Sequence, residues 1–169
     1  RILRFGDDSL DDDWTSCNGH RVVQVLPGLI DTRIAPLDAY VLCSCLYLDA
    51  KLDRDSTEQA VVLIDVRAGK GWPNPSPMAL IPYVKQLCRT LADIMPERLC
   101  HCVVYPVPFP ARLVWAVFKG FLDPKHVQKV KIFWGMAMVT SPAPKKQMRE
   151  FFDDQIIEGF EASRKSEFR

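Results

Sequence analysis

The sequence of 169 residues has no apolar run of the roughly 18 residues that a membrane-spanning helix needs. Histidine is scarce: His20, His101 and His126 are the only three, and none has an evident nucleophile partner. The P-loop pattern G-x-x-x-x-G-K-[ST], the hydrolase pattern G-x-S-x-G and the zinc-protease pattern H-E-x-x-H are all absent. These absences predict that the chain does not cross a bilayer and argue against several common enzyme classes.

Six cysteines are present, and most of them lie in apolar, periodic segments where a reduced cysteine packs as a small hydrophobic side chain. We therefore expect free thiols at Cys17, Cys43, Cys45, Cys88, Cys100 and Cys102. The Cys43/Cys45 and Cys100/Cys102 pairs are spaced more tightly than the ligands of structural zinc sites, so we predict no metal and no cofactor. A remote alternative is a cysteine-dependent enzyme in which Cys88 or Cys100 is activated within a pocket.

The net charge is only +1, but the charges are unevenly distributed. Five aspartates crowd residues 7–13, and we expect residues 1–18 to form an acidic, disordered arm. Between Leu99 and Arg149, eight basic residues accompany a single acid, Asp123, which gives this stretch a charge of +7. Such a stretch favours anionic partners such as phospholipid headgroups or nucleic acid, although charges that only solvate helix faces would give the same count.

Apolar patterning alternates between strand and helix along the chain. Strands are predicted at residues 21–26, 59–66, 99–107 and 130–134, and helices at 37–48, 78–95 (interrupted or kinked by Pro82), 110–122 and around the apolar stripe of Met148, Phe152, Ile156 and Phe160. This order predicts an α/β domain with a mainly parallel β-sheet covered by helices. We expect one domain over residues 19–163, followed by a charged tail at 164–169.

The helix predicted at residues 111–122 is apolar around almost its whole circumference, with Arg112 and Lys119 as its only charged residues. A surface helix normally has one apolar stripe and one polar face. This helix is therefore either buried centrally, which its periodicity favours, or forms the wall of a hydrophobic ligand cavity. Arg112 and Lys119 are two turns apart on one face, where they could hold an anionic headgroup or reach into water.

Three motifs mark the later half of the chain. Met95-Pro96-Glu97-Arg98-Leu99 resembles the "YPERL" motif of the CRAL-TRIO family of lipid-binding domains. Val107-Pro108-Phe109 and Phe118-Lys119-Gly120-Phe121-Leu122-Asp123-Pro124 are similar to its "NAPxxF … FKPFLDP" pattern, at the family's own spacing. The resemblance weakens towards the N-terminal side, where Val61 to Asp65 resembles the family's strand that ends in aspartate.

The resemblance implies a sheet that floors a hydrophobic pocket, with the helix at 110–122 as its movable gate. It implies a ligand site formed by Phe109, Arg112, Leu113, Val114, Val117, Phe118, Lys119, Phe121 and Gln86. Lys119 matches a basic residue of phosphoinositide-binding members, but Gln86 replaces the acid that accompanies it there. The resemblance therefore argues against an inositol lipid.

The function expected from this resemblance is the binding, and possible transfer or sensing, of a phospholipid or another hydrophobic small molecule, without enzymatic activity. We expect a cytoplasmic protein, a piece of a longer chain, that associates peripherally with an anionic membrane surface and does not bind nucleic acid. The alternative is a regulatory protein-interaction or membrane-targeting module whose pocket is degenerate.

Overall fold

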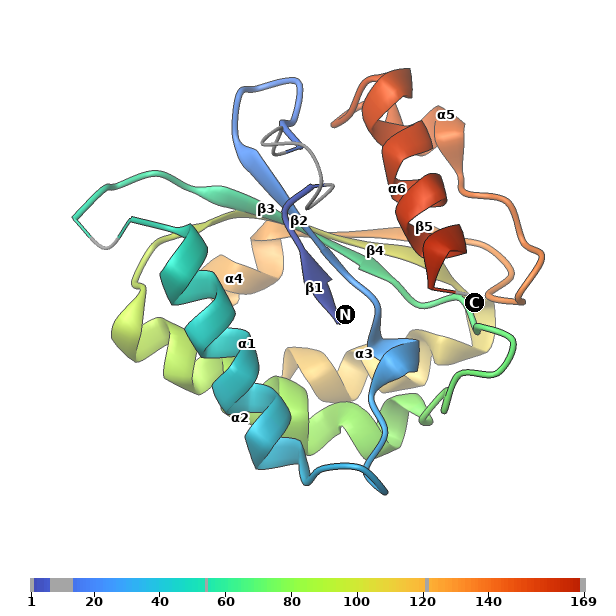
Figure 1. Cartoon of the computed structure of the whole chain (residues 1–169), viewed down its shortest axis with the longest axis horizontal. Helices are drawn as coiled ribbons and strands as arrows, with labels where there is room; N and C mark the ends of the chain where they lie inside the picture. The colour runs from blue at the N-terminus through green and yellow to red at the C-terminus, as the bar shows by residue number, and fades with distance from the viewer. Residues whose placement is uncertain (1, 7–13, 54, 121, 168–169) are drawn as a thin grey trace.

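The computed structural model describes residues 2–6, 14–53, 55–120 and 122–167. Figure 1 shows a sheet with helices on both sides. The elements in chain order are β1 (Leu3–Arg4), β2 (Arg21–Val25), η1 (Pro27–Leu29), α1 (Leu37–Lys51), β3 (Ala60–Asp65), η2 (Pro77–Leu80), α2 (Ile81–Ile94), β4 (Leu99–Val107), η3 (Phe109–Ala111), α3 (Arg112–Lys119), α4 (Pro124–Lys129), β5 (Val130–Trp134), α5 (Lys145–Met148) and α6 (Asp154–Ser166).

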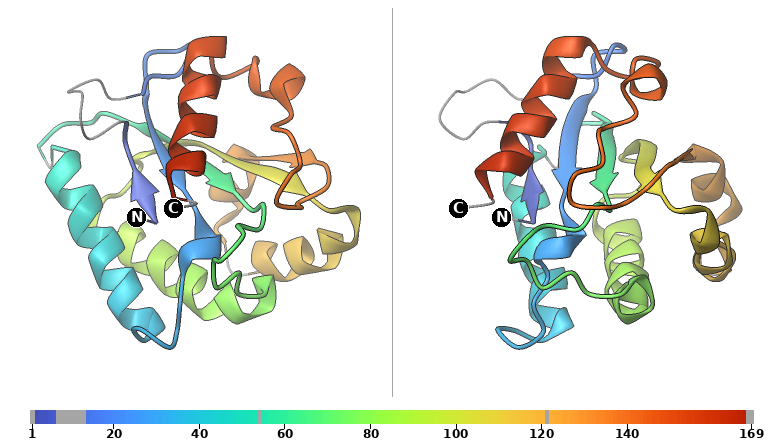
Figure 2. Two further views of the ribbon diagram at one scale, coloured as in Figure 1. Left: turned by 45° about the vertical axis from the view of Figure 1, so that its right-hand side comes forward. Right: turned by 90° about the vertical axis from the view of Figure 1, so that its right-hand side faces the viewer.

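The strands form one sheet in the order β1-β2-β3-β4-β5, in which β1 is antiparallel to β2 and the other neighbours are parallel. This confirms the predicted α/β fold with a mainly parallel sheet. Because β2 to β5 follow one another in the same direction, right-handed crossovers place every connecting helix on one face. Figure 2 shows α1, α2 and α3 on that side of the sheet and α6 on the other.

The two faces of the sheet carry separate hydrophobic cores, as strand alternation requires. Residues at alternate positions of β2, β3 and β4, such as Val22, Leu63 and Val103, pack with the aromatic side chains beneath α6. On the opposite face, Val23 and Ala60 pack with residues of α1 and with Met95. The continuous apolar run of β3 is therefore explained, because both of its faces are covered.

The predicted disordered arm is wrong for the part of residues 1–18 that the structure describes. Leu3 and Arg4 pair with Val25 and Gln24 at the edge of the sheet. Phe5 and Trp14 are buried, and the Trp14 ring lies 4.9 Å from that of Phe160. These apolar residues flank the aspartate run and bury enough surface to hold both ends of the segment. The five aspartates themselves lie outside the described residues.

The end of the chain also differs from the prediction. The stripe from Met148 to Phe160 does not lie on one helix, because the Asp153 carboxylate caps a new helix, α6, by accepting a hydrogen bond from the backbone N–H of Ile156 (2.8 Å). The expected charged tail at 164–169 is wrong at its first residue, since Arg164 lies within α6 and is buried. Residues 168–169 lie outside the described part of the chain.

The other predicted elements appear in the predicted order with small shifts, whereas β1 and α4 were not predicted. Pro82 does not break α2; it occupies the first turn, where the missing N–H costs no helical hydrogen bond. The helix predicted at 110–122 is shorter and begins with the 3-10 turn η3 before α3. None of the described helices combines the length and apolar content needed to cross a bilayer.

Candidate functional site

The helix α3 follows η3 and lies on the same side of the sheet as α1 and α2 (Figure 2). Although it is apolar almost all round, none of its described residues is buried. Val114, Trp115 and Phe118 are half-buried, and their spacing places them on one side of the helix. We infer that this side is turned to the protein, so α3 covers the sheet only loosely.

The sheet face on this side is apolar and incompletely covered. Val62 of β3 packs at the edge of the core beneath α1, and the ladder pairs place Ile64, Cys102, Val104 and Ile132 on the same face. All five side chains are only half-buried. We call these five residues the gate-side face. Buried strands of a small domain normally exclude solvent completely, as Leu63 and Val103 do on the other face at 0% exposure. This apolar face is therefore only partly shielded from solvent.

The polar residues of the predicted site lie on α2 and α3, the helices on this side of the sheet. Arg112 and Lys119, at the two ends of α3, and Gln86 on α2 are all exposed. The Arg112 guanidinium stacks over the Phe109 ring at 5.0 Å from its centroid. Seven residues of helix separate Arg112 from Lys119 by about 10 Å along the axis, too far for both side chains to hold one phosphate group easily.

The structure divides the predicted apolar residues into two groups. Val114 and Phe118 lie on the half-buried side of α3. Phe109, Leu113 and Val117, spaced four residues apart, are 67%, 80% and 46% exposed. The helix α3 thus presents one apolar side to the protein and a second to solvent. Phe121 lies outside the described residues.

The sequence analysis missed a buried polar cluster on the opposite face of the sheet, beneath α6. Arg67 donates to Asp65 (Nη2 to Oδ2, 2.7 Å), to Glu161 (Nη2 to Oε1, 2.5 Å) and to the carbonyl oxygen of Ser141 (2.9 Å). Arg164 lies 3.5 Å from Asp65. Asp65, Arg67 and Arg164 are almost fully inaccessible. No local sequence signal brings together residues so far apart in the chain.

Burial and ion pairing have opposite effects on the pKa values of the arginines in this cluster. Burial acts to lower the pKa of Arg67, but its hydrogen bonds to Asp65 and Glu161 raise that pKa overall, so the guanidinium stays charged. Burial lowers the pKa of Arg164. The Tyr105 hydroxyl nearby has no hydrogen-bond partner among the described residues, and burial raises its pKa well above the usual value. The cluster fixes α6 to the ends of β3 and β4.

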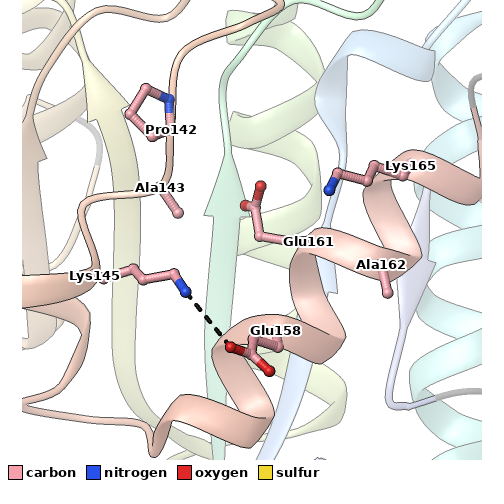
Figure 3. Close-up of a pocket in the computed structure, with 7 residues that line it drawn as sticks. All are labelled: Pro142, Ala143, Lys145, Glu158, Glu161, Ala162 and Lys165. Carbon is pink, nitrogen blue, oxygen red and sulfur yellow. Dashed lines mark ion pairs between the residues drawn. The ribbon is translucent and has the colours of Figure 1, made fainter.

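Two surface hollows lie away from the gate-side face. One, of about 420 Å³, lies between α6 and residues 142–145 and is crossed by the ion pair of Lys145 with Glu158 at 3.6 Å (Figure 3). Figure 3 also shows Glu161 pointing away from α6 into this region. Its four charged lining residues make it unsuitable for an apolar ligand. The other, of about 390 Å³, lies where η3 meets the end of β5.

The six thiols are free, and their environments differ. Cys17 and Cys43 are exposed, whereas Cys45 is buried. Burial raises the pKa of Cys102, on the gate-side face, to about 12, and it also raises the pKa of Cys88 and Cys100. Raised values leave these thiols protonated at neutral pH, so none of the three has the character of an activated nucleophile.

Comparisons with known proteins agree with this geometry. The family model of the CRAL/TRIO domain matches residues 16–158. The fold is similar to that in the crystal structure of Sfh5, with a TM-score of 0.51 and 16% sequence identity over 82% of this chain and 47% of that chain. This chain therefore spans about half the length of that protein. No curated protein matches the chain.

Proposed function

The chain belongs to the CRAL/TRIO domain family, and from this premise we propose that it binds one phospholipid molecule between the gate-side face and α3. The family consists mainly of non-enzymatic proteins that bind lipids or other hydrophobic ligands. The observation that carries the proposal is the pairing of two apolar surfaces, the gate-side face and the inner side of α3, that are only half-buried. Acyl chains between them would remove this apolar area from water.

The gate helix would close over the ligand by moving as a unit. It has no buried residue of its own, so its displacement breaks little packing. The Pro108, Phe109 and Pro110 sequence at its start and the segment around Gly120 at its end bound the mobile unit. In this proposal Val114, Trp115 and Phe118 contact the acyl chains, whereas Leu113 and Val117 stay outside.

The headgroup would be held at the far end of α3 by Lys119. Among the described residues Lys119 forms no ion pair, and an ammonium group binds phosphate oxygens without a fixed direction of approach. Gln86 supplies a neutral amide where an acid would recognise inositol hydroxyls, which favours phosphatidylcholine or a related lipid. Arg112, at the other end of the helix, does not contact the headgroup in this proposal.

The setting proposed for this activity is the cytoplasmic side of a membrane, from which lipid is taken or to which it is delivered. The stretch from Leu99 to Arg149 carries a charge of +7, and five of its eight basic residues lie on α3, α4 and β5, whereas the other three lie on or directly after α5. It would draw the domain to anionic lipid before the gate opens.

Native mass spectrometry and organic extraction of the purified chain test this function. We expect a co-purified phospholipid in stoichiometric amount, released by solvent and restored by incubation with phosphatidylcholine vesicles. A chain that neither carries nor takes up lipid would instead support a protein-interaction module with an empty pocket.

A further inference from the structure

A second apolar surface lies beside the gate, formed by the segment that follows β5. Trp134, Met136, Met138 and Val139 are 39%, 62%, 52% and 37% exposed, and the exposed ring of Phe109 lies 6.1 Å from that of Trp134. We call these five residues the apolar rim. We propose that the apolar rim inserts into the interfacial region of an anionic bilayer and anchors the domain beside the start of the gate helix. This inference rests on the proposed lipid function. It assigns membrane binding to a surface that does not hold the bound lipid.

Hydrogen bonds connect the rim segment that follows β5 to the rest of the fold. The Gly135 N–H donates to the Val107 carbonyl (3.0 Å), and the Ala68 N–H donates to the Ala137 carbonyl (3.1 Å). The Ser141 carbonyl accepts from the buried guanidinium of Arg67 (2.9 Å). The cluster beneath α6 therefore supports the base of the segment whose apolar side chains face solvent.

Its backbone is also suited to a medium of low polarity. Met138 and Ser141 form a closed turn, in which Met138 N–H donates to Ser141 Oγ (3.2 Å) and Ser141 N–H donates to the Met138 carbonyl (3.1 Å). A polar backbone group that loses water without a partner costs several kcal/mol in a bilayer. Internal pairing in the rim lowers this cost of insertion.

The surface of the rim carries no charge. The hollow of about 390 Å³ between η3 and β5 is lined by Pro108, Phe109, Pro110, Trp134, Gly135 and Met136, and the segment from Trp134 to Ala143 contains no ionisable side chain. Tryptophan is enriched where protein meets the headgroup region, and methionine adapts to irregular apolar surroundings.

Charge around the rim favours an anionic bilayer over a protein partner. No aspartate or glutamate occurs between Pro124 and Arg149; of the six basic residues there, Lys129, Lys145 and Arg149 pair with acids elsewhere in the chain, and Lys125, Lys131 and Lys146 form no ion pair within the described residues. Arg112 stacks on Phe109 at the edge of the rim, and Lys70 follows two residues after Ala68, which is bonded to its base. An uncharged apolar surface with the exposed cations Arg112 and Lys70 beside it is suited to an acidic membrane surface.

The experiment is vesicle co-sedimentation of the full chain and the double variant Met136→Asp/Met138→Asp. The matched control is Leu42→Asp/Leu46→Asp on α1, whose two leucines are 59% and 57% exposed and which changes the charge equally. On phosphatidylcholine–phosphatidylserine vesicles we expect the rim variant to bind at least about tenfold more weakly, from lost apolar area and added negative charge. The control should bind like the parent chain. Equal binding of parent and rim variant, or equal loss in the control, would overturn the proposal.

Two further measurements separate the proposal from its premise. The first is quenching of Trp134 fluorescence by brominated phosphatidylcholine in vesicles, obtained as the difference between the parent chain and Trp134→Phe. Quenching should be present, and it reports insertion of the parent chain itself, which carries no destabilising substitution. Its absence would overturn the proposal.

The second is uptake of an NBD-labelled phosphatidylcholine from detergent solution, which should be unchanged in the rim variant. A parent chain that inserts Trp134 but takes up no lipid would refute the proposed function and leave the rim assignment standing. A parent dimer that the rim variant converts to a monomer would assign the surface to a second copy of the chain instead.

Discussion

Asp65 and Arg67 stand two residues apart at the end of β3, face each other at 2.7 Å between Oδ2 and Nη2, and are both inaccessible to solvent. The Arg67 guanidinium also reaches Glu161 on α6 and the carbonyl of Ser141. One buried ion pair thus joins the central strand, the last helix and the segment that carries the apolar rim. Removing Arg67 would leave the buried Asp65 carboxylate with Arg164, 3.5 Å away, and without the hydrogen bonds that Arg67 donates to it.

Arg67→Ala should destabilise the fold by about 3–5 kcal/mol, because Asp65 and Glu161 would lose a buried cation. Urea denaturation followed by circular dichroism measures this loss. Arg149→Ala is the matched control, since Arg149 pairs with Asp154 at the surface, and it should leave the midpoint almost unchanged. Similar midpoints for the two variants would show that the buried pair does not stabilise the domain.

Phe118→Asp should abolish phospholipid uptake while the protein stays folded, because a carboxylate facing acyl chains carries a desolvation cost of several kcal/mol. Val117→Asp, on the exposed side of the same helix, should retain uptake from detergent solution. Native mass spectrometry after incubation with lipid measures both. If Val117→Asp lost the lipid and Phe118→Asp kept it, the orientation assigned to α3 would be reversed.

Lys119→Ala should weaken phospholipid binding by about 1–3 kcal/mol, the usual loss for a charge-assisted hydrogen bond. Arg112→Ala should leave uptake from detergent unchanged and reduce binding to anionic vesicles, since Arg112 lies beside the apolar rim. Competition between phosphatidylcholine and phosphatidylinositol for the NBD-labelled lipid checks the role of Gln86. A clear preference for phosphatidylinositol would contradict the headgroup assignment.

Cys102 should react with iodoacetamide at pH 8 at least about a hundredfold more slowly than Cys17 or Cys43, because thiolate is the reactive form and burial raises the pKa of Cys102 to about 12. An unfolded thiol titrates near pH 8.5. The contribution of this thiol to stability is therefore fully present below about pH 8.5 and is lost as pH rises towards 12. Peptide mapping of the labelled protein measures the rates, and comparable labelling of all three cysteines would contradict the raised pKa of the half-buried Cys102.

Binding to vesicles should require anionic lipid and weaken with salt, because the charge of +7 between Leu99 and Arg149 acts within a Debye length of about 10 Å at 0.1 M salt. Co-sedimentation with phosphatidylcholine alone and with added phosphatidylserine, over a series of salt concentrations, tests this. Equal binding to both vesicle types would exclude an electrostatic contribution.

The sequence by itself determined the order of the main strands and helices, since continuous apolar runs and helical apolar spacing are local properties that β3 and α1 display within a few residues. It also determined that α3 would be apolar all round and that acids would be missing after Pro124. The resemblance at Met95 to Pro124 identified the family that the comparison then confirmed over residues 16–158.

Only the tertiary structure decided what each apolar or charged residue contacts. Periodicity marks Val114, Val117 and Phe118 as equally apolar, and only the placement of α3 against the sheet leaves Val117 outside. The sequence pattern placed Arg164 in a charged tail. In the structure Arg164 is buried against Asp65, because α6 packs at the end of β3. Partners so distant along the chain leave no local signal; their pairing depends on how the chain packs after its elements have formed.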